Sequence, residues 1–124
     1  MLGKQNLVAF VATKDGAAAR KFYEGALGLE VEHEDDFAIA FDAHGTSLRI
    51  QKFAGFRPQP FTALGWTVPD IEAAVDDLAK RGVKFERYGG IDQDERGIWN
   101  ASSGAKVAWF KDPDGNTLSL TELG

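Results

Sequence analysis

The chain of 124 residues contains no cysteine, and this absence removes several kinds of chemistry at once. Disulfides, thiolate metal sites and a cysteine nucleophile are all excluded. Only two histidines are present, so the commonest nitrogen ligand for transition metals is scarce. No block of lysine or arginine occurs and the net charge is −5, so we expect no nucleic-acid partner.

Long apolar runs are also missing. No segment approaches the about 20 apolar residues that a membrane-spanning helix requires, and the N-terminus lacks the pattern of a signal peptide. We therefore expect no membrane partner and a cytoplasmic location. A chain of this length is expected to form one domain over residues 1–124, and to bury roughly two-thirds of its unfolded surface.

A repeat is the most informative feature that the sequence does contain. A strand-like run followed by a helix-like run occurs twice, and the aspartates that open the two helical patterns, Asp15 and Asp70, lie 70 − 15 = 55 positions apart. A second pair of similar segments surrounds Gly45 and Gly115, with an offset of 115 − 45 = 70. Such duplication indicates two similar modules. We place these modules at residues 5–53 and 61–122.

The helical patterns predict one helix over 16–27 and another over 71–81. Gly28 and Gly82 follow them, as a left-handed C-terminal cap requires. Each helix is followed by a β-prone run, at residues 29–32 and 83–88. The order of one strand, one helix and then several strands, used twice, indicates an α+β fold with mainly antiparallel pairing. The segment Ala54–Pro60, with its glycine and two prolines, is predicted to be the loop between the modules.

Four strand-like runs alternate between apolar residues and small or polar ones. Each predicted strand therefore has one face for the helices and one of different character. The second faces contain Val8, Phe10 and Ala12; Ser47, Arg49 and Gln51; Ala63, Gly65 and Thr67; and Thr117, Ser119 and Thr121. A surface of small residues, hydroxyls, one arginine and one phenylalanine is more typical of a ligand-binding wall than of a core.

Together these features resemble the vicinal oxygen chelate superfamily, which includes glyoxalases, bleomycin-resistance proteins and dioxygenases. The resemblance rests on residues 15–29, residues 68–83 and the hairpin motif 110–116, and it covers nearly the whole chain. It implies paired βαβββ modules that form a curved mixed sheet, a cup whose inner face holds the site. It also implies a homodimer.

Metal-dependent members of this superfamily bind a divalent ion with four inward side chains, usually His, Glu or Gln. The resemblance carries these four positions onto Val8, Arg49, Ala63 and Ser119. Valine and alanine have no donor atom, arginine repels a cation and a neutral serine hydroxyl is a poor ligand. We therefore expect no metal and no other cofactor.

An alternative stays open, in which the metal ligands have moved. Gln51, Glu122 and Glu32 would then serve a metal-dependent lyase or dioxygenase of the glyoxalase type. His33 is expected in an acidic turn and His44 in a hairpin turn, both exposed to solvent. A third possibility is a structural subunit with a vestigial cup.

Arg49 is the leading candidate for ligand binding, because a guanidinium can hold a carboxylate, phosphate or enolate with two hydrogen bonds. An ion pair with a loop acid is the competing interpretation, with Asp92, Asp94 or Glu95 as the partner. Trp99 lies in the segment 92–104, by which the second module exceeds the first. This segment is expected to form either a lid or pocket rim, or an ordinary loop.

Catalysis lacks a candidate, because no nucleophile stands beside a histidine and the four strands supply no carboxylate to the expected cup. We therefore expect metal-independent binding of a small anionic or aromatic molecule. Candidate aromatic lining residues are Phe10, Trp99, Tyr88, Phe53 and Phe56. The expected ligand-binding residues are Arg49, Phe10, Gln51, Thr67, Ser119, Thr121, Trp99, Val8, Ala63 and Gly65.

Overall fold

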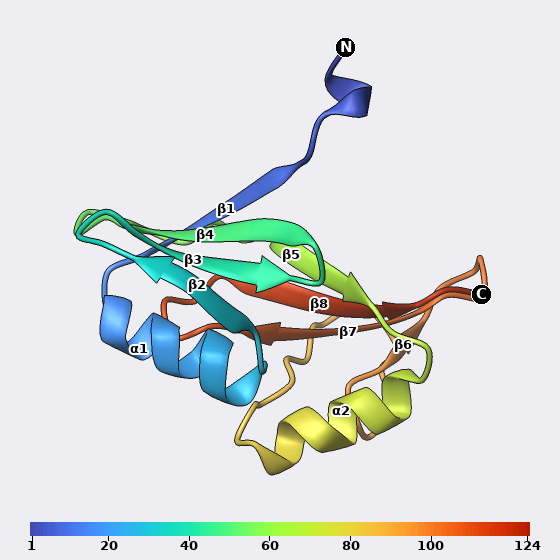
Figure 1. Cartoon of the computed structure of the whole chain (residues 1–124). Helices are drawn as coiled ribbons and strands as arrows, with labels where there is room; N and C mark the ends of the chain where they lie inside the picture. The colour runs from blue at the N-terminus through green and yellow to red at the C-terminus, as the bar shows by residue number, and fades with distance from the viewer. The chain divides into compact units, whose positions relative to one another are not determined.

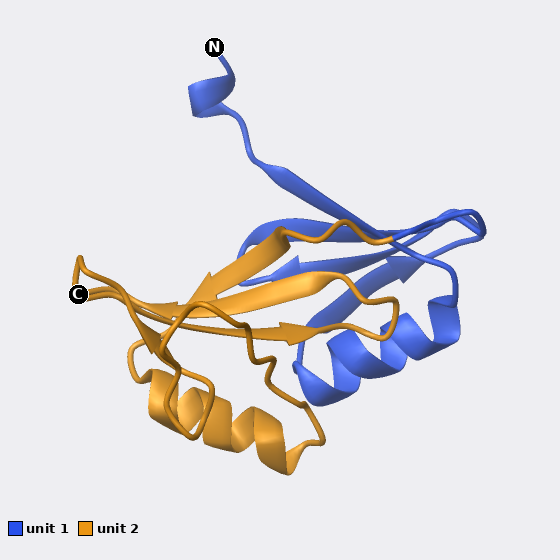
Figure 2. Cartoon of the chain, turned by 180° about the vertical axis from the view of Figure 1, so that it is seen from behind, with its two compact units in different colours: residues 1–57 blue, residues 58–124 orange.

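The computed structural model describes residues 1–124, which form two compact units, residues 1–57 and 58–124 (Figure 2). Each unit contains one four-stranded mixed sheet and one main helix (Figure 1). This arrangement confirms the α+β class and the paired βαβββ modules expected from the repeat. None of the helices is long and apolar enough to pass through a bilayer.

The first unit opens with a short 3-10 turn, η1 (Leu2–Lys4). The elements that follow are β1 (Val8–Thr13), α1 (Gly16–Arg20), η2 (Lys21–Ala26), β2 (Glu30–Glu34), β3 (Ala38–Ala43) and β4 (Thr46–Lys52). The strand order is β1-β4-β3-β2, where β1 and β4 are parallel and the other pairs are antiparallel. The helix lies on one face of this sheet, against β3 and β4 (Figure 1).

The second unit repeats this plan. Its elements are β5 (Thr62–Thr67), α2 (Ile71–Lys80), β6 (Trp99–Asn100), β7 (Lys106–Lys111) and β8 (Thr117–Glu122). The strand order β5-β8-β7-β6 matches that of the first unit, with β5 and β8 again parallel. The helix α2 packs on β7 and β8. Residues 53–61, around the predicted loop, contain no helix or strand.

Both helices begin where the sequence predicts, because an aspartate caps each first turn. The Asp15 carboxylate accepts a hydrogen bond from the Ala18 N–H, and the Asp70 carboxylate accepts one from the Ala73 N–H, each at 3.1 Å. These acceptors satisfy N–H groups that have no partner within the helix. At the other end of α2, Gly82 has a φ of +90°, which confirms the expected left-handed cap.

The first predicted helix changes its hydrogen-bond spacing midway. It is α-helical over Gly16–Arg20 and π-helical over Lys21–Ala26, where the Leu27 N–H donates to the Phe22 carbonyl at 3.0 Å. Within the wider turns, Tyr23 is fully buried and its ring lies 5.9 Å from that of Phe41 on β3. The wider turn thus coincides with the place where the helix contributes its largest core side chain.

The core of each unit lies between its sheet and its helix. In the first unit it comprises Val11, Ala19, Tyr23, Ile39, Phe41, Leu48 and Ile50. In the second it comprises Ile71, Val75, Val83, Ile98, Ala108, Phe110, Leu118 and Leu120. These strand residues alternate with more exposed ones in β1, β4 and β5, so the predicted faces are confirmed there.

The predicted strand over 83–88 is wrong. This segment contacts β7 only through a bridge between Phe85 and Phe110, together with a bond from the Glu86 N–H to the Trp109 carbonyl. The chain then leaves the sheet and returns as β6, which pairs with the far end of β7. The edge of the second sheet is thus made of two short pieces, because the extra residues of this unit interrupt what would otherwise be one strand.

Candidate functional site

Each sheet has one face without a helix, and these two faces contain the candidate site residues. On the first sheet, cross-strand pairing places Phe10, Arg49 and Ala40 in one row. We call this surface the Arg49 face; it comprises Val8, Phe10, Ala12, Ser47, Arg49, Gln51, Ala38, Ala40, Asp42, Glu30 and His33. The core residues Leu48 and Ile50 point the other way, since side chains alternate along β4.

Arg49 is exposed on this face and forms no ion pair within the first unit. Its neighbours in the row differ in size: Phe10 is 54% exposed, whereas Ala40 is small and buried. Of the loop acids considered as partners, Asp94 uses its carboxylate within its own loop, accepting from the N–H groups of Arg96 and Ile98 at 2.9 Å. Within the first unit, the Arg49 guanidinium has no acidic partner.

The Arg49 face also contains two carboxylates, Asp42 on β3 and Glu30 on β2, and neither strand was among the four alternating runs of the sequence. Asp42 pairs with Ser47 on β4 and with Glu30 on β2, which places it on this face. The run Ala38–Ala43 alternates apolar Ile39 and Phe41 with the small or polar residues of the face, and this signal was available in the sequence. The Asp42 carboxylate accepts from the Gly45 N–H at 2.8 Å, so one of its oxygens stabilises the β3–β4 turn.

His33 lies on strand β2 and not in a turn as predicted, while the turn occupies residues 35–37. A β-bulge between Val31 and His33 leaves Glu32 unpaired and places His33 opposite Ala40. The bulge adds one residue to β2, so the strand continues past His33 and the turn begins only after it. His33 is exposed, with Nε2 3.4 Å from the Asp35 carboxylate.

On the second sheet, the corresponding surface contains hydroxyls, small residues and aromatic rings. Pairing places Gly65, Ser119 and Trp109 in one row across β5, β8 and β7. Thr67, Thr121, Val107 and Trp99 form the adjacent row. We call this surface the Trp109 face; it comprises Gly65, Thr67, Thr117, Ser119, Thr121, Val107, Trp109, Lys111 and Trp99, with Ala63 in the bulge at the end of β5.

Three aromatic rings meet on the Trp109 face. The Trp109 ring centroid lies 5.5 Å from that of Tyr88, edge-on at 77°, and 6.1 Å from that of Trp99. Burial raises the pKa of the Tyr88 phenol, as does the nearby Glu86 charge, while a hydrogen bond with Thr117 acts in the opposite direction. Trp109 was missed by the sequence analysis because strand β7 was not included among the alternating runs.

Trp99 lies on the edge strand β6, paired with Val107, and not in a loop. The preceding loop is held in place by side chains. The Gln93 amide donates to the carbonyls of Glu86 and Gly97, at 3.0 and 2.8 Å. Arg96 donates to Asp76 on α2 at 2.9 Å, and this bond lowers the pKa of the Asp76 carboxyl.

The positions that the resemblance assigns to metal ligands do not fit a divalent cation. Val8 and Arg49 lie on the first sheet, and Ser119 and Ala63 belong to the second, where Ala63 lies in a β-bulge. None of these side chains is a usual donor. Elsewhere too, no three side chains of His, Cys, Asp or Glu gather closely enough to hold a metal ion.

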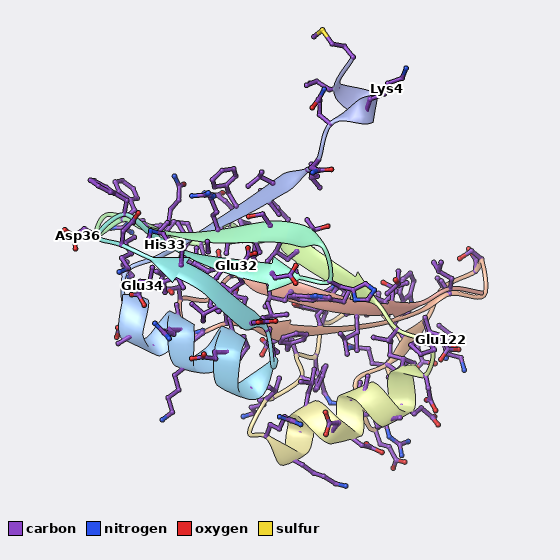
Figure 3. The ribbon with its side chains drawn as sticks, viewed as in Figure 1. Lys4, Glu32, His33, Glu34, Asp36 and Glu122 are labelled. Carbon is purple, nitrogen blue, oxygen red and sulfur yellow. The ribbon has the colours of Figure 1, made fainter.

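Glu122, considered as a relocated ligand, is engaged by the fold. Its carboxylate accepts from the Ile71 N–H at 3.0 Å and lies 3.9 Å from the Lys106 ammonium. Figure 3 shows it at the end of β8, near the beginning of α2. The carboxylate thus satisfies a first-turn N–H of that helix.

Comparison with known proteins agrees with this architecture. A family model described as the Glyoxalase/Bleomycin resistance protein/Dioxygenase superfamily matches residues 5–120. The chain belongs to this superfamily. Among curated proteins, the uncharacterized protein YraH of Bacillus subtilis (strain 168) is 28% identical over 119 residues, covering 83% of this chain and 86% of YraH.

Solved structures of the superfamily show the same fold. The bleomycin resistance determinant encoded on the transposon Tn5 has a TM-score of 0.75 at 18% identity, covering 97% of this chain and 98% of that one. TnmS3, an antibiotic binding protein from Streptomyces sp. CB03234, has a TM-score of 0.72 at 23% identity, covering 98% of this chain and 97% of that one.

Proposed function

We propose that this superfamily member binds a small anionic or aromatic molecule and does so without a metal ion. Arg49 supplies positive charge, aromatic side chains supply stacking surface and the hydroxyl and amide groups supply hydrogen bonds. The residues assigned to the ligand are Arg49, Phe10, Gln51 and Val8 on the first sheet, and Thr67, Ser119, Thr121, Trp99, Ala63 and Gly65 on the second.

The proposal rests mainly on one observation, the exposure of the Arg49 side chain and its lack of an ion pair in its own unit. Its guanidinium is exposed, without an ion pair in its own unit, on a sheet face that no helix covers. The other basic residues of this sheet region are engaged: Arg20 and Lys52 both pair with Glu34, at 2.8 Å. A free planar guanidinium beside an exposed phenylalanine suits a flat anion such as an aromatic carboxylate.

Two structural relatives support binding rather than catalysis as the activity. One is named for bleomycin resistance and the other is called an antibiotic binding protein. Their identity to this chain is low, so they support the class of function and not a particular ligand. The poor donors at the metal positions, Val8, Arg49, Ala63 and Ser119, support the metal-independent form of the proposal.

Thermal unfolding of metal-stripped protein tests the proposal. The protein is first titrated with Ni²⁺, Zn²⁺, Mn²⁺ and Fe²⁺, and then with small carboxylates such as benzoate and 2-naphthoate. A ligand at a hundred times its Kd adds about 2.7 kcal/mol, which raises the Tm of a domain of this size by several degrees. We expect such a rise with the aromatic carboxylates and none with the metals.

Two variants make the result specific. Arg49→Gln removes the charge while keeping most of the side-chain length, and should abolish the rise in Tm caused by carboxylates. Arg57→Gln removes the same charge from the exposed connecting loop and serves as the matched control. A saturating one-equivalent shift with a single metal would contradict the proposal and favour the metal-dependent lyase or dioxygenase. A homodimer is part of the same proposal, and sedimentation analysis would test it.

A further inference from the structure

The two sheets carry different side chains at equivalent places in the same row. Phe10, Arg49 and Ala40 form this row on the first sheet, whereas Gly65, Ser119 and Trp109 form it on the second. The bulky ring thus sits at the β1 end of one row and at the β7 end of the other. The second sheet has no charge in its row and leaves the β5 end free of any side chain.

Gly65 has no side chain, and the side chain of the neighbouring Ser119 lies close to the space that this leaves on β5. A Cβ atom added to Gly65 would lie only 2.6 Å from the Ser119 hydroxyl oxygen. The serine side chain therefore leans toward the space that glycine leaves, and it is itself only 8% exposed. On either side of Gly65, Ala63 and Thr67 are exposed, so β5 offers a low strip of backbone and small side chains.

The far end of the row is an aromatic wall. Trp109 is half-buried and its ring is flanked by Tyr88 and Trp99. Gly65 and Trp109 lie two strand spacings apart, which is about 9.5 Å. A fused pair of aromatic rings is of similar length.

We infer that the Gly65–Ser119–Trp109 row is a shelf for a planar aromatic ring, and that Gly65 sets the space available to it. This inference rests on the proposed function and adds the chemical class of the ligand on the second sheet. The ring would lie over Gly65, with the Ser119 hydroxyl beneath it and Trp109 at its edge. An aromatic contact of this kind adds affinity beyond that of the buried area alone.

Tryptophan fluorescence provides the test, because the three tryptophans divide between the two faces. Trp99 and Trp109 lie on the Trp109 face, whereas Trp66 pairs with buried Leu120 on the helix side. The probes are 2-naphthamide, which is planar and neutral, 2-naphthoate, which is planar and anionic, and decahydro-2-naphthoate, which is anionic but not planar. Quenching and the Tm are followed together with each probe.

We expect 2-naphthamide to quench the native protein and the Trp66→Phe control equally. Trp109→Phe should lose most of the quenching while remaining folded, as its own Tm will show, and Gly65→Ala should weaken binding by about tenfold or more. Because Gly65→Ala forces Ser119 to move, the double variant Gly65→Ala/Ser119→Ala relieves that clash while keeping the added methyl. It should remain weak for the planar probes.

The outcomes separate this inference from the proposed function. If 2-naphthoate and its saturated analogue raise the Tm equally, and only Arg49→Gln abolishes the rise, the shelf is wrong and the anion-binding proposal stands. If 2-naphthamide binds through Trp109 and Arg49→Gln leaves the rise in Tm with every carboxylate unchanged, the shelf stands and the anion-binding proposal fails. Absence of quenching by both naphthalene compounds at millimolar concentration overturns the shelf.

Discussion

Strand β4 allows the assignment of the two faces to be tested by substitutions at four consecutive residues. Leu48 and Ile50 are almost fully buried against the helix side, while Arg49 and Gln51 are exposed on the Arg49 face. Ile50 pairs with Val11 on one side and with Ile39 on the other, so its side chain is enclosed by core residues of both neighbouring strands.

Replacing Ile50 with alanine should therefore be costly. Truncation of a fully buried isoleucine removes its transfer free energy and leaves a cavity, which together cost about 3 kcal/mol. For a domain of this size, that loss lowers the Tm by about 12 °C. Leu48→Ala should behave similarly.

Arg49→Gln and Gln51→Ala should change the free energy of unfolding by no more than about 0.5 kcal/mol, since neither side chain is buried or paired within its unit. The assay is thermal unfolding followed by circular dichroism, with urea unfolding to compare the m-values. If Arg49→Gln lowered the Tm as much as Ile50→Ala, Arg49 would belong to a structural network and could not be free for a ligand. A cost below about 1 kcal/mol for Ile50→Ala would refute the assigned faces.

Three further predictions concern local features. Asp70→Ala removes the acceptor of the Ala73 N–H and should cost about 1 kcal/mol in urea unfolding, whereas Asp70→Ser should retain most of the stability. Gly82→Ala places a side chain at a φ of +90° and should cost about 1 kcal/mol, although no atom lies near enough to clash. Hydrogen bonds from Lys52 and then Arg20 lower the pKa of the Glu34 carboxyl, so its stabilising effect is complete above the unfolded pKa of about 4.3 and is lost as the pH falls through the lower folded value. The Tm difference between the native protein and Lys52→Met should therefore shrink between pH 6 and pH 3, and a constant difference would contradict this account.

Much of the Arg49 face could be predicted, because alternation along a single strand depends only on residues two positions apart. Val8, Phe10, Ser47, Arg49 and Gln51 all project from the face that was expected. Asp42 was also predictable, since β3 alternates in the same way.

The Trp109 face was less accessible to sequence analysis. The contact among Tyr88, Trp99 and Trp109 joins residues from three separate segments. Two of these segments form the interrupted edge of the second sheet. Both the residues 83–88 and the residues 99–100 contact β7, and the loop between them is held by the Gln93 amide and by the ion pair between Arg96 and Asp76 on α2.

The sequence by itself determined the features that depend on near neighbours along the chain. These are the aspartate caps, the glycine that ends α2, the repeat and the alternating faces of the strands. Only the tertiary structure decided which distant groups meet: Glu122 with the Ile71 N–H, and Ser119 with Gly65 on one side and Trp109 on the other. The physical reason is that the backbone N–H and C=O groups at a sheet edge or a helix end can find hydrogen-bond partners in several chemically similar segments. Which segment becomes the partner depends on how the whole unit packs.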